Sequence, residues 1–237
     1  LIEWKNREDR KPLILNGARQ VGKTWLLHEF AKLEYKKEAY VVCRKNNLAR
    51  QLFSQDFNVD RILRGLRAMT SVDITPGDTL IILDEIQDSP EALESLKYFK
   101  EEVPEYHIAV AGSLLGISLH QDVSYPVGKV NVINIFPMNF EEFLKATDPV
   151  LYAYYDSIQK EQQIEEIFHN RLLEAYNNYL IIGGMPECVA SWVNHKDPAR
   201  VAQIQRELVE VYENDFSKHN GKVNSGRILM VFRSIVA

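Results

Sequence analysis

The sequence predicts an α/β fold in which a parallel five-stranded sheet is flanked by helices and followed by an all-helical region. Two observations support this prediction. Up to about residue 135, short apolar runs typical of strands buried on both faces alternate with segments of helical periodicity. From residue 139 onward the pattern is helical only. The expected strands cover residues 12–15, 39–43, 80–83, 106–113 and 130–135.

The helices between these strands follow from apolar spacing and from capping residues. After the first strand, Trp25, Leu26, Leu27, Phe30 and Leu33 recur at helical spacing, and residues 46–69 are expected to form two helices with a break at 56–60. Ser89 should cap a helix that starts at Pro90, and Asn139 should cap another. Residues 114–129 are expected to form a loop and a turn.

Composition narrows the class of protein. The 237 residues suffice for one large domain or two modest ones. A net charge of −5 argues against a protein that coats nucleic acid with its whole surface, although a local basic patch stays open. The sequence has no signal-peptide pattern and no apolar run near the length of about 18 residues that suggests a membrane helix. We therefore expect no membrane contact and a cytoplasmic location, with Cys43 and Cys188 as reduced core thiols.

Residues 17–24 fit the pattern of glycine, four residues, glycine, lysine, then serine or threonine. The glycines let backbone N–H groups point inward, and Lys23 and Thr24 open a helix whose N-terminus favours anions. We expect a P-loop in which Lys23 reaches the β and γ phosphates and Thr24 binds Mg²⁺. The residues assigned to nucleotide binding are Gly17, Ala18, Arg19, Gln20, Val21, Gly22, Lys23, Thr24 and the adjacent Trp25.

A second motif follows the third apolar run, where Asp84 and Glu85 come directly after residues 80–83. Four apolar residues that end in two acids are typical of a Walker B strand, which emerges beside the phosphate loop. We expect Asp84 to hold Mg²⁺ through water and Glu85 to orient the attacking water. Gln87 either helps to place water or serves in a turn or a helix cap. Small GTPases are disfavoured because the sequence lacks an Asn-Lys-x-Asp base-reading motif.

The fourth apolar run ends in Ser113. In P-loop ATPases with an extra strand between the loop-bearing strand and the Walker B strand, a polar side chain at the tip of this strand lies near the γ-phosphate. Ser113 is therefore the candidate for a catalytic sensor, and a plain strand-to-loop turn is the alternative interpretation.

The segments GARQVGKT, LDEIQ, AGS, FPMNFEEF and IGGMPE together resemble a family of bacterial and archaeal AAA-like P-loop ATPases related to signal-transduction ATPases. The resemblance covers most of the chain and implies an ATPase core and a helical lid. In that family, a winged-helix segment and a C-terminal domain of uncertain, nuclease-like character follow the lid.

The resemblance also implies roles for two further residues. In related signal-transduction ATPases a Gly-x-Pro in the lid packs its proline on adenine, and residues 184–186 match this pattern. Pro186 is therefore a candidate base contact, with a purely structural turn as the alternative. Relatives often carry arginine after the glycine at 128, where this chain has Lys129, and this departure weakens an arginine-finger assignment. Lys129 is either a solvated lysine or a trans-acting cation.

Taken together, the residues predict an ATPase core over 1–138, a helical lid over 139–220 and the start of a truncated C-terminal region over 221–237. We expect ATP hydrolysis with Mg²⁺, coupled to closure of the core and the lid. The alternatives are a slow ATP-dependent regulatory switch and a DNA- or defence-related ATPase whose output lies in the missing C-terminal domain. ATP and ADP are the expected ligands, while a homo-oligomer and a nucleic-acid or protein partner stay open.

Overall fold

The computed structural model describes residues 1–113, 128–159, 163–219 and 221–236. The described residues divide into two compact units, Leu1–Ile135 and Phe136–Ala237, here called the core unit and the helical unit. The predicted loop and turn over 114–129 lie almost entirely outside the described residues. A separate C-terminal region from residue 221 stays a prediction, because the contacts group 221–236 with the helical unit.

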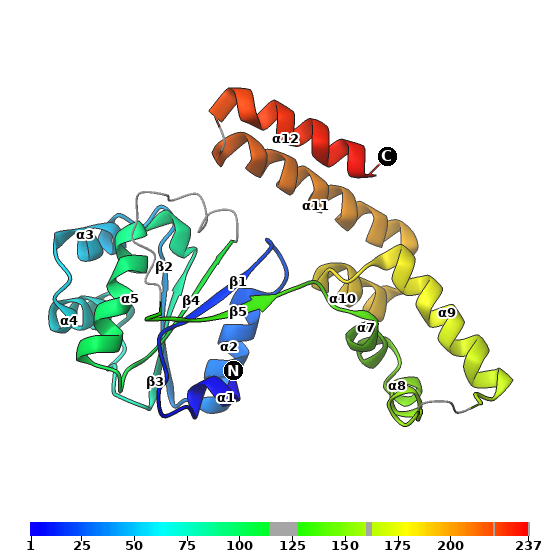
Figure 1. The fold of residues 1–237 in the computed structure, drawn as a ribbon, viewed down its shortest axis with the longest axis horizontal. Coiled ribbons are helices and arrows are strands. Elements are labelled where there is room, and N and C mark those ends of the chain that lie inside the picture. Colours follow the sequence, from blue (N-terminus) through cyan, green and yellow to red (C-terminus); the bar gives the residue numbers. More distant parts are fainter. Residues whose placement is uncertain (114–127, 160–162, 220, 237) are drawn as a thin grey trace. The chain divides into compact units, whose positions relative to one another are not determined.

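Within the described residues, five strands form one parallel sheet in the order β2-β3-β4-β1-β5 (Figure 1). Every apolar run of the sequence analysis overlaps one of these strands, but β2 and β5 are only partly buried because they form the edges of the sheet. The fourth run, β4, separates β1 from β3 as expected for a P-loop ATPase with an inserted strand. The bounds are β1 (Leu13–Gly17), β2 (Lys37–Val42), β3 (Thr79–Asp84), β4 (His107–Ser113) and β5 (Asn131–Ile135).

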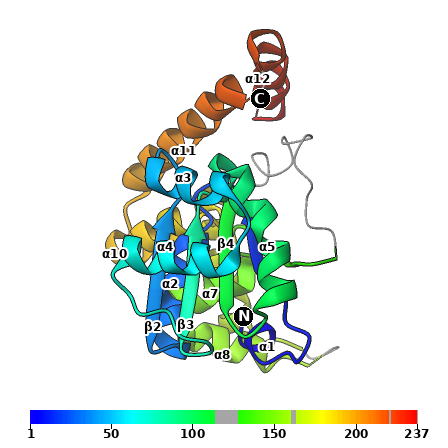
Figure 2. The same ribbon diagram turned by 90° about the vertical axis from the view of Figure 1, so that its left-hand side faces the viewer.

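Helices cover both faces of the sheet because alternate residues of the buried strands point to opposite sides. Ile14, Ile81 and Val110 face one core cluster together with α3, α4 and α5, which lie in front of the sheet in Figure 2. Leu15 and Ile82 face a second cluster with α1 and α2. The bounds are α1 (Ile2–Lys5), α2 (Lys23–Glu34), α3 (Asn47–Gln55), α4 (Val59–Thr70), the 3₁₀ turn η1 (Ile86–Asp88) and α5 (Pro90–Glu102).

Helix α2 forms at the expected spacing, whereas one detail of the helix expected at Pro90 is wrong. Trp25 and Leu33 are 67% and 76% exposed, because α2 turns only the face that carries Leu27 and Phe30 toward the sheet. Helix α5 does start at Pro90 with Ser89 as its N-cap residue, but the Ser89 side chain makes no cap hydrogen bond, and its buried hydroxyl has no partner among the described residues. Ser89 directly follows the tight turn η1, and its backbone rather than its side chain bonds to the turn.

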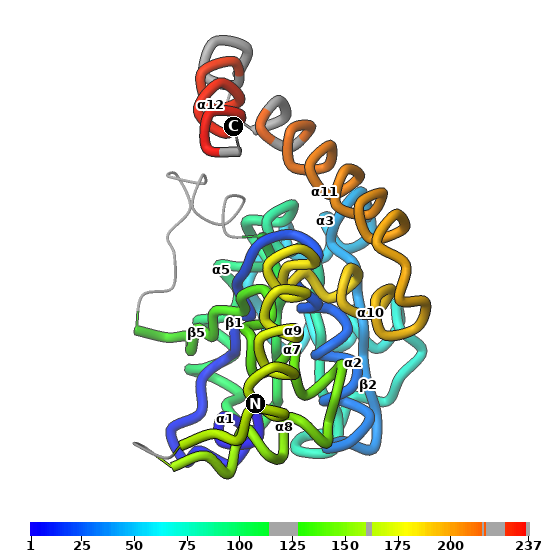
Figure 3. Tube along the Cα trace, turned by 90° about the vertical axis from the view of Figure 1, so that its right-hand side faces the viewer, coloured from blue at the N-terminus to red at the C-terminus, as the bar shows by residue number. Residues whose placement is uncertain are grey.

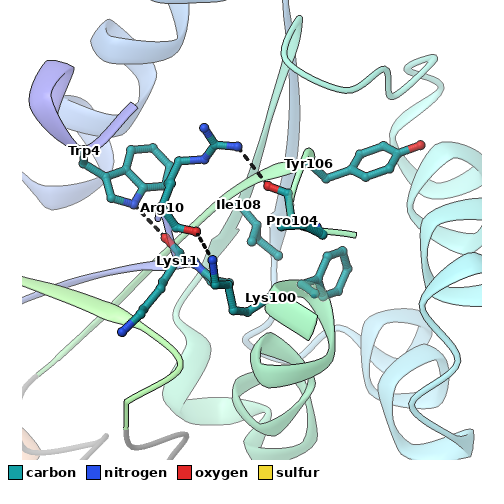
Figure 4. A pocket seen from close by; sticks show the side chains of 9 residues that line it. Trp4, Arg10, Lys11, Lys100, Pro104, Tyr106 and Ile108 are labelled. Carbon is teal, nitrogen blue, oxygen red and sulfur yellow. Dashed lines mark hydrogen bonds between the residues drawn. The ribbon is translucent and has the colours of Figure 1, made fainter. Parts of the chain in front are cut away.

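The N-terminal segment is fastened to the edge of the sheet where the strands begin (Figure 4). Trp4 is buried and donates from Nε1 to the carbonyl of Lys11 at 2.7 Å. Arg10 donates to the carbonyl of Pro104 and Lys100 to the carbonyl of Arg10, each at 2.9 Å. Arg10 and Lys100 line the recess drawn in Figure 4. Their hydrogen bonds to backbone carbonyls hold the N-terminal segment against the sheet.

The helical unit is built from packed helices (Figure 3). Its core consists of Phe143, Ile182, Cys188, Val189, Val201 and Leu208. The last two helices lie side by side, with the rings of Phe216 and Phe232 5.1 Å apart. The bounds are α7 (Phe140–Thr147), α8 (Pro149–Asp156), α9 (Glu166–Ile182), α10 (Pro186–His195), α11 (Pro198–His219) and α12 (Gly221–Val236).

Two sequence motifs of this unit, FPMNFEEF at residues 136–143 and IGGMPE at residues 182–187, contact each other. Asn139 caps α7 through a capping box with Glu142, as predicted. Just before the cap, Met138 N donates to the carbonyl of Gly184 at 2.7 Å, and the Tyr179 hydroxyl donates to the carbonyl of Met138 at 3.0 Å. A Cβ on Gly184 would lie only 2.0 Å from the Met138 oxygen. The glycine is therefore required by a close approach of two backbones.

Both cysteines lie within the described residues, and both are buried and free of disulfide bonds, as expected. Burial raises the pKa of the Cys43 thiol to about 12. In the described part of the chain, no helix has the length and apolar character needed to cross a membrane.

We expect Gly184→Ala to destabilise the helical unit, because a methyl group there meets backbone and not a flexible side chain. Overpacking of this kind costs about 1–3 kcal/mol. Urea unfolding followed by circular dichroism would measure the loss. Gly226→Ala is the matched control, because its Cβ meets nothing within 4 Å and alanine favours the helix by up to about 1 kcal/mol. Equal midpoints for wild type and Gly184→Ala would contradict the packing argument.

Candidate functional site

The glycine-rich loop leaves β1 at Gly17 and enters α2 at Lys23. Gly17 must lack a side chain because a Cβ there would lie 2.3 Å from the carbonyl oxygen of Ile135 on β5. Gln20 and Gly22 have left-handed backbones, with φ of 62° and 89°. Gly22 is the N-cap residue of α2, so no side chain caps the first-turn amides. The helix therefore presents uncapped N–H groups beside the end of β1, which suits an anion.

Lys23 is held inside the loop by the loop's own backbone. Its Nζ donates to the carbonyls of Gly17 and Ala18, at 3.0 Å and 2.7 Å. Burial lowers the pKa of Lys23, and the negative charges of Glu85 and Asp84 oppose this shift. The ammonium group is thus partly removed from water and lies in the field of the two acids that follow β3.

The other residues of the loop differ in exposure. Ala18 and Gln20 are exposed, Arg19 is half-buried and Val21 is buried under the loop. Burial is the main cause of the lowered pKa of Lys23, and the positive charge of Arg19 also lowers it. Trp25 projects from the first turn of α2 and is 67% exposed.

Asp84 lies at the end of β3 and is 7% exposed. The Thr24 hydroxyl on α2 donates to its Oδ2 at 2.8 Å, and the backbone N–H of Glu85 donates to its Oδ1 at 2.8 Å. Two residues that are sixty positions apart in the sequence therefore meet through one hydrogen bond. Their hydroxyl and carboxylate oxygens are the donor type that Mg²⁺ selects.

Glu85 and Ser113 are joined through Gln87. Glu85 has a left-handed backbone with φ 53° and opens the turn η1, which brings Gln87 back toward it. The amide of Gln87, only 4% exposed, donates to Glu85 Oε2 and accepts from the backbone N–H of Ser113 at 3.4 Å. Ser113 is also the register partner of Gly17. The sheet thus brings Glu85 and Ser113 to the edge that carries the loop.

Tyr40 on β2 is a contact of the site that the sequence analysis did not identify. Its hydroxyl donates to Asp84 Oδ2 at 3.0 Å. Burial, followed by the negative charge of Asp84 and this hydrogen bond, raises the pKa of Tyr40, so the phenol stays protonated as a donor. The alternation of side chains along β2 could have suggested this contact. Val42 is the register partner of Asp84, and Tyr40, two residues earlier, lies on the same face of the strand as Val42.

Two other sequence candidates belong to other parts of the chain. Lys129 forms an ion pair with Glu101 at 2.8 Å, just before β5 begins at Asn131. It therefore lies at the edge where the strands start, opposite the edge that carries Thr24 and Asp84. Pro186 belongs to the helical unit and occupies the first turn of α10.

Comparison with solved structures finds several proteins of low similarity. A structure of PCH-2 from C. elegans is 12% identical, with a TM-score of 0.41 and coverage of 80% of this chain and 56% of the other. The RuvB Holliday junction branch migration motor from Thermotoga maritima is 16% identical, with a TM-score of 0.43 and coverage of 82% and 57%. This chain thus spans little more than half of either protein.

A third structure is a signal transduction ATPase with a tetratricopeptide repeat sensor from Pyrococcus horikoshii, which is 14% identical. Its TM-score is 0.40, and the match covers 74% of this chain and 26% of the other. No curated protein matches this chain.

Family comparison gives a firmer result. The AAA domain family matches residues 9–144, which include the loop, β3 and β4, and a family described only as a domain of unknown function matches residues 173–237. Because the first match covers more than half of the sequence, this chain belongs to the AAA domain family of AAA-like P-loop ATPases.

Proposed function

We propose that the core unit binds ATP and hydrolyses it with Mg²⁺. The observation that carries the proposal is the hydrogen bond between the Thr24 hydroxyl and the Asp84 carboxylate. It joins the N-terminus of α2, where phosphates bind favourably, to an acidic strand end that suits a cation. A magnesium–nucleotide complex would use both groups, because the loop and the helix N-terminus would bind the phosphates while Thr24 and Asp84 would hold the ion.

Each residue of the site has a role under this proposal. Lys23 and the amides of the loop bind the phosphates, Thr24 ligates Mg²⁺, and Asp84 holds the ion through water. Mg²⁺ would neutralise charge on the phosphates. Glu85 orients the attacking water. Gln87 fixes the orientation of the Glu85 carboxylate through their hydrogen bond, and Ser113 contacts the γ-phosphate as a sensor. Catalysis would consist of positioning and electrostatic stabilisation without a covalent intermediate.

We extend the proposal to the helical unit, in which Pro186 contacts the adenine base and nucleotide binding closes the unit on the core. Support comes from the backbone contacts of the segment that carries this proline. Met138 and Gly184 are joined by a backbone hydrogen bond of 2.7 Å just before α10 begins. A base contact on such a segment would move with the whole unit and not only with one side chain.

A slow nucleotide switch is the second candidate function, and the ion pair of Lys129 favours it. With Lys129 engaged by Glu101 at the opposite sheet edge, this lysine does not complete its own chain's site. A transition-state cation supplied in trans raises phosphoryl-transfer rates by about 10³ to 10⁵. A chain that lacks such a cation would therefore hydrolyse ATP slowly until it assembles with another copy or with a partner.

We expect Lys23→Ala to weaken ATP binding by about tenfold or more, because a charge-assisted contact to phosphate is worth roughly 1.5–3 kcal/mol. Titration calorimetry with a non-hydrolysable ATP analogue and Mg²⁺ would measure the change. Lys36→Ala removes an exposed lysine that pairs with Asp78, and it serves as the control. Equal affinities for wild type and Lys23→Ala would contradict the phosphate-binding assignment.

We expect Glu85→Gln to retain ATP binding and to lose hydrolysis by about 10² to 10⁴-fold, the usual contribution of a positioned base. Single-turnover assays with bound ATP would separate chemistry from binding. Glu94→Gln changes a carboxylate of α5 that pairs with Lys97, and it should leave the rate unchanged. Undiminished hydrolysis in Glu85→Gln would remove Glu85 from the mechanism.

The two candidate functions differ in how the rate depends on protein concentration. If the site is complete within one chain, the ATPase rate per chain should stay constant over a hundredfold range of concentration. If a trans cation completes it, the rate per chain should climb as the protein assembles. Light scattering on the same samples would relate the rate to the oligomeric state, and a rise without assembly would contradict the switch.

A further inference from the structure

Tyr40 reaches the acidic end of β3 from the neighbouring strand. Its hydroxyl donates to Asp84 Oδ2 at 3.0 Å, the same oxygen that accepts the Thr24 hydroxyl at 2.8 Å. Asp84 Oδ1 accepts the N–H of Glu85. The carboxylate is thus oriented from α2, from β2 and from the chain that follows it, and Tyr40 supplies the contact from β2.

The phenol ring is itself held in place. His28 follows Thr24 by one helical turn on α2, and its ring centroid lies 4.6 Å from that of Tyr40. His28 Nδ1 is 2.7 Å from Glu38 Oε1, and Glu38 shares the strand and the face of Tyr40. The helix that carries the Thr24 hydroxyl therefore also packs against the tyrosine, and Thr24 and Tyr40 both donate to the same oxygen of Asp84.

We propose that Tyr40 is a positioning residue for Mg²⁺, because its hydroxyl fixes the direction in which the Asp84 carboxylate meets the water shell of the ion. This inference rests on the proposed function. Mg²⁺ demands near-ideal octahedral geometry and keeps several waters, so a carboxylate that binds through water must point in one direction. Outer partners that orient such groups typically contribute about 10- to 100-fold to metal affinity.

If the Tyr40 hydroxyl had a purely structural role, Tyr40→Phe would behave like the removal of another hydrogen-bonded tyrosine hydroxyl. Tyr35 offers that comparison. The Tyr35 hydroxyl bonds to His107 Nδ1 at 2.7 Å, near the edge where the strands begin. Tyr35→Phe and Tyr40→Phe each remove one hydroxyl that bonds to a side chain of a buried residue, and both keep the aromatic ring. Only Tyr40→Phe removes a contact to Asp84.

The test measures the binding of a fluorescent non-hydrolysable ATP analogue to the full chain, first in EDTA and then over a Mg²⁺ series. We expect Tyr40→Phe to raise the half-saturating Mg²⁺ concentration by about tenfold or more. Its affinity for the analogue in EDTA should stay within about twofold of wild type. Tyr35→Phe should match wild type in both measurements. His28→Ala, which removes the ring packed on Tyr40, should shift the Mg²⁺ dependence in the same direction by a smaller factor.

An unchanged or lowered half-saturating Mg²⁺ concentration in Tyr40→Phe would overturn the inference, as would an equal loss of affinity in EDTA. Asp84→Asn distinguishes this failure from failure of the proposed function. If wild type shows Mg²⁺-enhanced binding that Asp84→Asn loses, the proposed metal site stands and only the role of Tyr40 is rejected. If wild type shows no Mg²⁺-enhanced binding, both proposals are rejected.

Discussion

The hydrogen bond from Thr24 to Asp84 is the contact on which the candidate site depends. It spans 2.8 Å between the first turn of α2 and the last residue of β3, and so it connects the glycine loop with the acidic strand end. Such a contact can form only if β1 and β3 run parallel and α2 lies on the sheet face toward which Asp84 points. The parallel topology, with β1, β3 and β4 buried in the middle of the sheet, therefore determines which groups meet at the candidate site.

The order of the strands decides which other groups join this pair. Because β4 lies between β1 and β3, Ser113 at the end of β4 lies beside Gly17. The turn after β3 then brings the Gln87 side chain within reach of the backbone N–H of Ser113. Because β2 is the other neighbour of β3, Tyr40 can reach Asp84. The N-terminal segment and Lys129 occupy the opposite edge, where carbonyls and Glu101 engage their cations. The candidate nucleotide site and the contacts that hold the N-terminal segment therefore lie at opposite edges of one sheet.

The helical unit shows how a sequence motif can have a packing explanation that is independent of any ligand. The two glycines before Pro186 end α9 and admit the backbone of Met138, and a Cβ on Gly184 would collide with that backbone. Pro186 then starts α10, a position where its missing N–H costs nothing. A base contact by Pro186 would use a segment whose shape is already fixed by these backbone contacts.

The sequence by itself determined the strands, the loop and the acidic pair, because short apolar runs and glycine spacing are local properties that little else can satisfy. It also determined the cap at Asn139 and the break between α3 and α4. Only the tertiary structure decided that β2 borders β3, and hence that Tyr40 reaches Asp84, while Lys129 pairs with Glu101 at the opposite edge of the sheet. It also decided that Trp25 is exposed and that the Ser89 hydroxyl makes no cap. The physical reason is that strand order, helix rotation and side-chain partners depend on contacts between residues far apart in the chain.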